Sequence, residues 1–180
     1  MEITKITPLD ESLVIKMFDF FQNDVIKLSN GWQMEKELIS MRIIEDTTWA
    51  IQYYLEADHP RSHGGKYLYL YGLLQALVLQ QDAICSLSEA LFKSKISFNT
   101  NFPDLSAVRN LRNEVAGHPI DRDNTFISNF KLTKDNLSYT SEKEDKRWTN
   151  INLFEHIDKQ NRCVNTILSD IIAKIGANLQ

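Results

Sequence analysis

The stretch YLYLYGLLQALVLQQDAICSLSEALF, residues 67–92, decides the fold, because it is apolar on nearly every side of the helix that it predicts. A helix of this kind is surrounded by other helices. We therefore place a helix over about residues 67–93 at the centre of the molecule. Gln80 falls inside its strongest apolar stripe, and Asp82 lies about opposite. A glutamine that faces the core needs hydrogen-bond partners. We therefore regard Gln80 and Asp82 as candidates for a structural role as hydrogen-bonding residues.

Other helices are predicted on both sides of this stretch. Apolar residues recur at three- and four-residue steps, which is the helical period. The helices predicted in this way cover about residues 9–28, 33–57, 102–116 and 150–175. We expect Asn101 and Asn150 to cap the last two of them at their N-termini. Gly117 followed by Pro119 is a typical stop signal for the helix over residues 102–116.

A short β-structure interrupts the helical pattern before the last helix. Residues 125–142 contain two runs of β-branched and aromatic residues that meet at residues 134–136, which predicts a β-hairpin. The chain of 180 residues is long enough for one sizeable core and too short for two domains to be expected. We therefore expect a single all-α domain over residues 1–180, built as a bundle of about five helices with a small hairpin inserted before the last one.

The composition limits the functions that the chain can have. No run approaches the roughly eighteen uncharged apolar residues of a membrane span, and residues 1–10 lack the pattern of a signal peptide, so we expect a cytoplasmic protein without a membrane partner. Cys85 and Cys163 are far apart and lie in apolar helical runs, which favours buried free thiols over a disulfide or a zinc site. The formal charge of −4 argues against bulk electrostatic binding to nucleic acid, so any contact with phosphate must be local.

The loop DHPRSHGGK, residues 58–66, contains the nearest approach to a metal cluster. Asp58, His59 and His63 are metal-binding residue types, but Pro60 lies between them and no fourth ligand follows at helical spacing. We interpret the segment as a turn, and we expect neither a metal nor a cofactor. No phosphate-binding loop, serine-hydrolase motif or zinc-protease motif occurs in the sequence.

The fourth predicted helix ends in a cluster of polar side chains, within AVRNLRNEVAGHPID at residues 107–121. With Val108 set at the centre of the apolar face, Arg112 lies about 40° away and Asn113 about 140° away. Arg112 thus points along the edge of the apolar face, where a guanidinium is costly unless it is paired or lines a polar cleft. Arg109, at about 100°, lies nearer to solvent.

His118 follows the stop signal of this helix. If the helix continued, His118 would lie well away from Arg112, but Gly117 and Pro119 make continuation unfavourable. A left-handed turn at Gly117 would bring His118 back toward the arginine side. The distance between the histidine and the arginine therefore depends on a single turn.

The pattern Arg112-Asn113-x-x-x-x-His118 resembles the R-x(4–6)-H signature of the HEPN family, in which a polar residue follows the arginine. Its place at a helix end in a helical bundle is similar to the setting of that motif in the family. The resemblance implies a HEPN-like bundle that pairs as a homodimer and cuts RNA without a metal ion. It also implies that His118 is the general acid or base, that Arg112 stabilises the phosphate and that Asn113 has a positioning role.

These roles agree with the chemistry of RNA cleavage. Attack by the ribose 2′-OH needs a base for its proton, an acid for the 5′-oxygen and a cation for the charge that develops on phosphate. Imidazole exchanges protons near neutral pH, and a guanidinium binds phosphate oxygens as a fork. Because one chain supplies one histidine of the motif, a dimer would supply both partners of the proton transfer.

Two functions from different classes remain open. One is a metal-independent endoribonuclease in a toxin-antitoxin, phage-defence or stress system, with RNA as substrate and an antitoxin or another regulatory protein as partner. The other is a catalytically inactive HEPN-like module that binds RNA, a nucleotide or a protein. In that case Arg112 would bond a buried carboxylate such as Asp82 or the C-terminus of a helix, and His118 would be an ordinary residue at a helix C-terminus. Arg109, which we expect at the surface, is with Gln80 and Asp82 a candidate for a supporting role.

Overall fold

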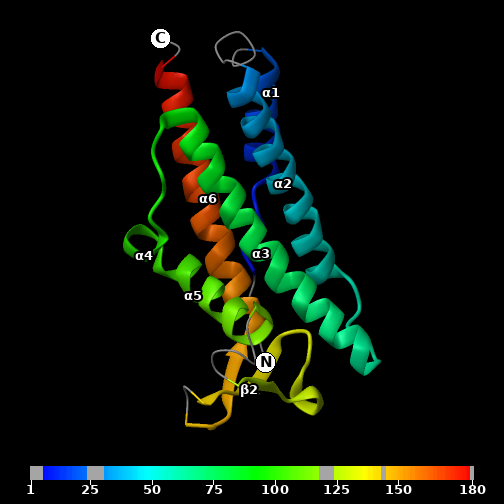
Figure 1. The fold of residues 1–180 in the computed structure, drawn as a ribbon. Coiled ribbons are helices and arrows are strands. Elements are labelled where there is room, and N and C mark those ends of the chain that lie inside the picture. Colours follow the sequence, from blue (N-terminus) through cyan, green and yellow to red (C-terminus); the bar gives the residue numbers. More distant parts are fainter. Residues whose placement is uncertain (1–5, 24–30, 118–123, 143–144, 179–180) are drawn as a thin grey trace.

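The computed structural model describes residues 6–23, 31–117, 124–142 and 145–178 (Figure 1). The α-helices in these ranges are α1 (Glu11–Asn23), α2 (Gly31–Glu56), α3 (His63–Phe92), α4 (Phe98–Asn101), α5 (Pro103–Arg112) and α6 (Leu153–Asn178). A π-helical turn, Asn113–Gly117, continues α5, and a 3₁₀ turn covers Asn129–Lys131. The strands are β1 (Phe126–Ile127), β2 (Asn136–Thr140) and β3 (Thr149–Asn152).

The long helix α3 runs between the other long helices (Figure 1). One of its sides remains exposed at Leu68, Tyr71 and Leu79, so the expectation that other helices surround it is confirmed only in part. α3 packs against α2, α5 and α6, whereas α1 packs against α2 and α6. The small sheet lies at one end of the bundle. The predicted helical bundle with a small β-insertion before the last helix is therefore confirmed in outline.

The central helix begins at His63 rather than at Tyr67, so the loop predicted over residues 58–66 is shorter than expected. Ser62 caps the helix, because its side-chain oxygen accepts a hydrogen bond of 3.1 Å from the backbone N–H of Gly65. This cap stabilises a first turn that contains two glycines, which are poor helix formers.

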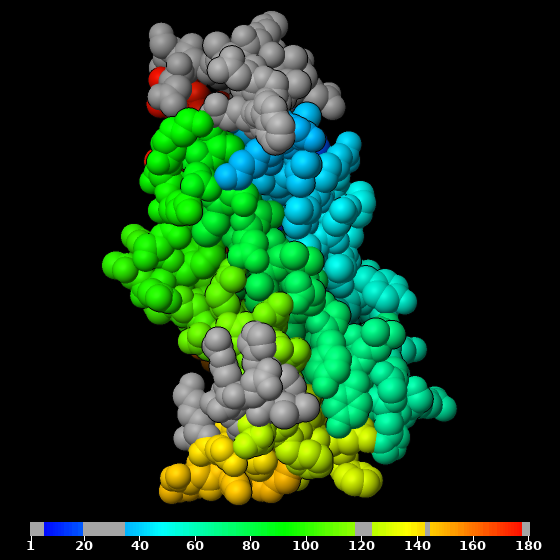
Figure 2. Space-filling view, in the orientation of Figure 1, coloured from blue at the N-terminus to red at the C-terminus, as the bar shows by residue number. Residues whose placement is uncertain are grey.

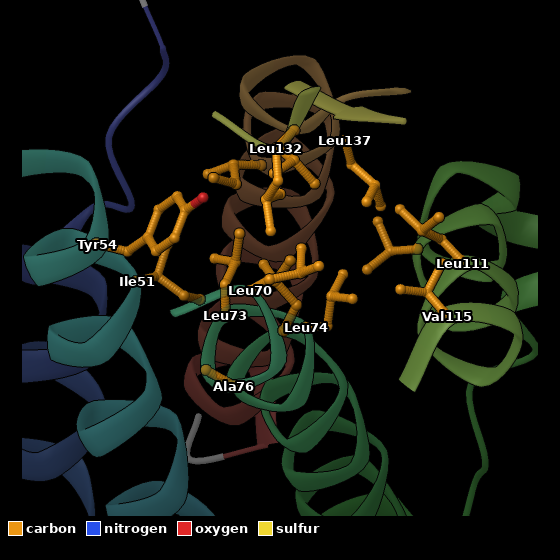
Figure 3. Close-up of a cluster of buried hydrophobic side chains, with 14 of the residues drawn as sticks. Ile51, Tyr54, Leu70, Leu73, Leu74, Ala76, Leu111, Val115, Leu132 and Leu137 are labelled. Carbon is orange, nitrogen blue, oxygen red and sulfur yellow. The ribbon is translucent and has the colours of Figure 1, made fainter. Parts of the chain in front are cut away.

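The apolar core consists of two clusters along the bundle. One cluster lies at the end that carries the sheet, where side chains of α2, α3, α5 and the sheet meet (Figure 3). Its members include Ile51, Tyr54, Leu70, Leu73, Leu111, Val115, Leu132 and Leu137. The other cluster joins α1, α2, α3, α5 and α6. The sheet therefore packs directly on the helical core.

A chain of buried amide side chains links the helices through the core. Gln81 of α3 donates from Nε2 to the backbone oxygen of Leu105 in α5 at 3.1 Å and to Oε1 of Gln160 in α6 at 2.8 Å. Gln160 donates in turn to Oε1 of Gln80 at 3.0 Å, and Gln80 donates to Oγ1 of Thr48 in α2 at 3.3 Å. These glutamines have no exposed surface. The partners that the sequence predicts for Gln80 are thus side chains of two other helices.

The β-insertion is a three-stranded antiparallel sheet, not the two-stranded hairpin that the sequence predicts. β2 pairs with β1, as expected, and also with β3. The third strand has a weak sequence signal, because Ile151 is its single apolar residue. Asn150, the expected cap of the last helix, lies in this strand and accepts a hydrogen bond from Ser138. The residue that caps α6 is Asn152, whose Oδ1 accepts from the backbone N–H of Glu155 at 3.0 Å.

A short helix, α4, precedes the fourth predicted helix and was not expected. Asn101, the expected cap of the fourth helix, is the last residue of α4. The residue before α5 is Phe102, whose side chain makes no capping bond, and Pro103 follows in the first turn, where its missing N–H breaks no helical hydrogen bond. Together, α5 and the π-helical turn cover the predicted range of residues 102–116 closely.

α1 begins at Glu11, close to the start predicted for the first helix. α2 matches the helix predicted over residues 33–57 closely, whereas the end predicted for the first helix, residues 24–28, lies outside the described residues. None of the helices in the described part of the chain is long and apolar enough to cross a membrane.

Truncation of Leu137 tests whether the sheet and the helices share one cooperative core. Leu137 of β2 is fully buried in the cluster that contains Leu111 and Val115. We expect Leu137→Ala to lower the free energy of unfolding by about 2–5 kcal/mol, because it removes buried methyl groups and leaves a cavity. Urea denaturation followed by circular dichroism measures this change. Leu68→Ala is the control, since Leu68 is 72% exposed, and an equal effect of the two variants would contradict this packing.

Candidate functional site

Helix α5 turns one face to the core and the other to solvent. Leu105, Val108 and Leu111 are buried, as is Val115 in the π-helical turn, so the predicted apolar face is confirmed. Arg112, the last residue of α5, is half-buried, in agreement with the edge position that the helical wheel gives it. The core contacts of α5 thus determine the side of the helix on which Arg112 lies.

Gly117 does not adopt the left-handed conformation that would bring His118 back toward Arg112. Asn113–Gly117 continue as a π-helical turn, and no glycine in the described ranges has a positive φ. A π turn is a rare conformation that occurs frequently at functional sites. His118 and Pro119, and with them the predicted direction of the histidine, lie outside the described residues.

Gly117 lies against the side chains of Arg112 and Asn113. A Cβ atom at this position would lie 3.2 Å from Nη1 of Arg112 and 3.5 Å from Oδ1 of Asn113. The first distance is shorter than an ordinary van der Waals contact. The missing side chain therefore leaves room for the guanidinium and the amide to pack against the end of the helix.

Two amide oxygens hold the guanidinium of Arg112. Nη2 and Nε donate to Oε1 of Gln75 in α3 at 2.9 and 3.3 Å, and Nη1 donates to Oδ1 of Asn113 at 2.9 Å. Within the part of the chain that the structure describes, no carboxylate forms an ion pair with Arg112. A guanidinium carries more N–H donors than these bonds use. Arg112 therefore has donors that these bonds do not use.

Arg109, one turn earlier on α5, has a different environment. Its Nη2 lies 2.6 Å from Oδ1 of Asp82 in α3, and the two side chains are 33% and 56% exposed. The hypothesis that Arg112 bonds Asp82 is therefore wrong, because the arginine that pairs with Asp82 is Arg109. An ion pair with this exposure contributes little to stability. Its main consequence is that Asp82 does not neutralise Arg112.

Gln75 is a residue of this site that was not predicted. It lies about two helical turns before Asp82 and thus on nearly the same side of α3. Gln75 accepts hydrogen bonds from Arg112, and Asp82 accepts one from Arg109. One side of α3 therefore supplies the partners of both arginines. A polar residue at this spacing from Asp82, on a helix that is otherwise apolar, is the signal that could have identified Gln75.

Exposed apolar side chains border the Arg112 site on α3. Tyr71 and Leu79 lie about one turn before and after Gln75, and each is 40% exposed. In the space-filling view, α3 reaches the surface as a green band beside the blue and cyan of α2 (Figure 2).

The weaker candidates from the sequence do not form sites. In the described ranges, Asp58, His59 and His63 belong to no group of side chains that could hold a metal ion. Cys85 and Cys163 are free thiols. Burial raises the pKa of each thiol, so neither has the character of an activated nucleophile.

Comparisons with models of protein families, with curated proteins and with solved structures give no match to this chain. Its function is therefore inferred from the residues and the geometry described above.

The surroundings of His59 predict a pH dependence of the stability of the fold. Burial lowers the pKa of His59 below its ordinary value of about 6.5, and the nearby charges of Lys66 and Lys134 lower it further. The folded state thus favours the neutral ring. Its contribution to stability is full above about pH 6.5 and is lost as the pH falls through the lower pKa of the folded state.

Replacement of His59 by glutamine removes this titration. When the pH is lowered from about 7 to about 5, we expect the free energy of unfolding to fall less in His59→Gln than in the wild type. Urea denaturation at each pH measures the difference. His63→Gln, at an exposed position in the first turn of α3, is the control. The same change in both variants would show that His59 is not the source of the pH dependence.

Proposed function

We propose that the chain is a metal-independent endoribonuclease of the HEPN type, with Arg112, Asn113 and His118 as its catalytic residues. The observation that carries this proposal is the environment of Arg112. Among the described residues, its side-chain bonds go to the amide oxygens of Gln75 and Asn113 and not to a carboxylate. Its charge is therefore available to a phosphate group.

In the proposed mechanism, each of these residues has its own role in RNA cleavage. The 2′-oxygen of a ribose attacks the adjacent phosphorus and loses its proton, and the bond to the 5′-oxygen breaks as that oxygen takes up a proton. The products are a 2′,3′-cyclic phosphate and a 5′-hydroxyl end. His118 exchanges one of the protons, and Arg112 stabilises the charge on the phosphate oxygens. Asn113 positions the guanidinium, because its Oδ1 accepts a bond from Nη1 of Arg112.

Gln75 extends the proposed site as a positioning residue. Its Oε1 accepts hydrogen bonds from two nitrogens of Arg112 and so holds the fork of the guanidinium in one orientation. A glutamate at this position would hold the fork in the same way and would also neutralise its charge. The neutral amide therefore suits an arginine that has to bind an anion.

A homodimer supplies the second proton-transfer group in this proposal. One chain contributes one His118, whereas cleavage needs both a base and an acid. Tyr71 and Leu79 give α3 an exposed apolar surface on both sides of Gln75. Aromatic and apolar residues of this kind are common at the centre of protein interfaces. A second copy that packs on this surface would bring two motifs together.

A second function is favoured by the bonds that Arg112 already makes. Three of its N–H groups are bonded within the chain, as they are in many arginines with a structural role. The chain would then be a catalytically inactive HEPN-like module that binds RNA, a nucleotide or a protein partner through this surface.

For the endoribonuclease we propose a toxin-antitoxin, phage-defence or stress setting, with an antitoxin or another regulatory protein as partner.

Nuclease assays in the presence of EDTA test the proposed activity. We expect the wild-type protein to cleave RNA and to leave cyclic phosphate and 5′-hydroxyl ends. His118→Ala and Arg112→Ala should each lower the rate by about 10²–10⁴-fold and keep the fold, because acid–base catalysis and charge stabilisation contribute on this order. Gln75→Glu should also lower the rate, since the new carboxylate would compete with phosphate for Arg112.

Arg42→Ala is the matched control for these variants, because Arg42 is exposed on α2 and pairs with Glu45. Its activity should equal that of the wild type. Wild-type cleavage by His118→Ala, or cleavage that requires a divalent metal, would contradict the proposal. RNA binding without cleavage by the wild type would favour the inactive module.

A further inference from the structure

A cleft lies between the N-terminal segment and the helical bundle, and none of the residues that line it belongs to the Arg112 site. It has a volume of about 190 Å³ and is bounded by residues 6–11, α2, α3 and α6. Ile6, Leu9, Ile51 and Leu55 make much of its wall apolar. A concave apolar surface with a few polar groups is the usual form of a site for a small molecule.

Hydrogen bonds to α6 hold the N-terminal wall of the cleft in place. The backbone N–H of Thr7 donates to Oδ1 of Asp158 at 2.7 Å, and the backbone oxygen of Thr7 accepts from Nδ2 of Asn161 at 2.9 Å. One turn further along α6, Nδ2 of Asn165 donates to the backbone oxygen of Pro8 at 3.1 Å. This wall is therefore positioned by specific bonds as well as by apolar contact.

Asn161 lines the cleft and carries an unpaired acceptor. The residue is 2% exposed and is among those that line the cleft. The bond from Nδ2 to Thr7 identifies the nitrogen of the side-chain amide, since a carbonyl oxygen can only accept. The other atom, Oδ1, is buried and has no hydrogen-bond partner among the described residues. A buried acceptor without a partner is unfavourable, so a molecule in the cleft that donates to it would be stabilised.

The ionisable groups of the cleft are acidic. Glu11 of α1 and Glu56 of α2 line it, and no lysine, arginine or histidine of the described ranges does so. Oε1 of Glu56 accepts a hydrogen bond from Nε2 of Gln52 at 3.0 Å, which holds this carboxylate beside the cleft. Charge complementarity therefore favours a cation in the cleft and disfavours an anion.

We propose that this cleft binds a small primary amine, in its protonated form, with a hydrocarbon body. The ammonium group donates to Oδ1 of Asn161 and is balanced by the carboxylates of Glu11 and Glu56, while the body packs against Ile51 and Leu55. A cavity of roughly 150 Å³ holds a benzene ring, so an amine of about the size of benzylamine matches the volume of this cleft. The site does not depend on the proposed nuclease activity.

Four probes of similar size separate shape, hydrogen bonding and charge. Benzylamine hydrochloride carries an ammonium group, benzyl alcohol a neutral donor, toluene no donor and benzoate a negative charge. Titration of the full chain near neutral pH, followed by ¹H–¹⁵N NMR, gives each affinity and shows which amides shift. We expect benzylamine to bind most tightly, toluene about tenfold more weakly and benzoate not at all. The side-chain amides of Asn161 and Gln80 should shift with benzylamine.

Two pairs of variants locate the binding. Glu56→Gln keeps the shape of the side chain and removes its charge, so it should weaken benzylamine about two- to fivefold and leave benzyl alcohol unchanged. Glu35→Gln, at an exposed position on the same helix outside the cleft, is its control. Leu55→Trp fills the cleft and should abolish the binding of both probes. Leu68→Trp, at an exposed position on α3, controls for the added ring.

Four results would overturn the proposal. The first is that toluene or benzoate binds as tightly as benzylamine, and the second is that Glu56→Gln and Glu35→Gln have equal effects. The third is that Leu55→Trp, correctly folded, binds benzylamine as the wild type does. The fourth is that benzylamine at concentrations on the order of millimolar shifts no amide of the cleft.

Discussion

Three buried glutamines impose the constraint on which the rest of the structure depends. Gln80, Gln81 and Gln160 have no exposed surface, and a polar group left without a partner in the core costs on the order of 1–3 kcal/mol. Their side-chain nitrogens and oxygens are hydrogen-bonded within the described residues, with the exception of Oε1 of Gln81. Their hydrogen bonds reach Thr48 of α2 and the backbone of Leu105 in α5, while Gln160 itself belongs to α6. A shift of one helix along its axis would break these bonds, because hydrogen bonds require specific distances and angles. The network therefore determines how α2, α5 and α6 sit on α3.

The environment of Arg112 follows from this constraint. The bond from Gln81 to the backbone of α5 fixes α5 along the length of α3. As a result, Arg109 forms an ion pair with the carboxylate of Asp82, and Arg112 donates hydrogen bonds to the neutral amide of Gln75. The charge of Arg112 is thus not neutralised by any carboxylate in the described ranges. The proposed chemistry on RNA depends on this feature, because a phosphate group would have to compete with such a carboxylate.

The features that depend on local periodicity could be predicted from the sequence. The central place of α3 and the buried position of Gln80 follow from an apolar stripe on a helix, and the edge position of Arg112 follows from the helical wheel. β3 could not be predicted, because its residues are mostly polar and its stability comes from pairing with β2, including the contact of Ser138 with Asn150. The bond from Arg112 to Gln75 was missed because it depends on how α5 packs on α3.

A double-mutant cycle on Gln81 and Gln160 tests the role of the amide network most directly. Gln81→Leu and Gln160→Leu should each destabilise the fold, because each leaves buried polar groups without a partner. The double variant should lose less than the sum of the two, with a coupling energy of about 0.5–3 kcal/mol measured by urea denaturation. Additivity of the two changes within about 0.3 kcal/mol would show that the glutamines act independently, and it would contradict the role assigned to the network.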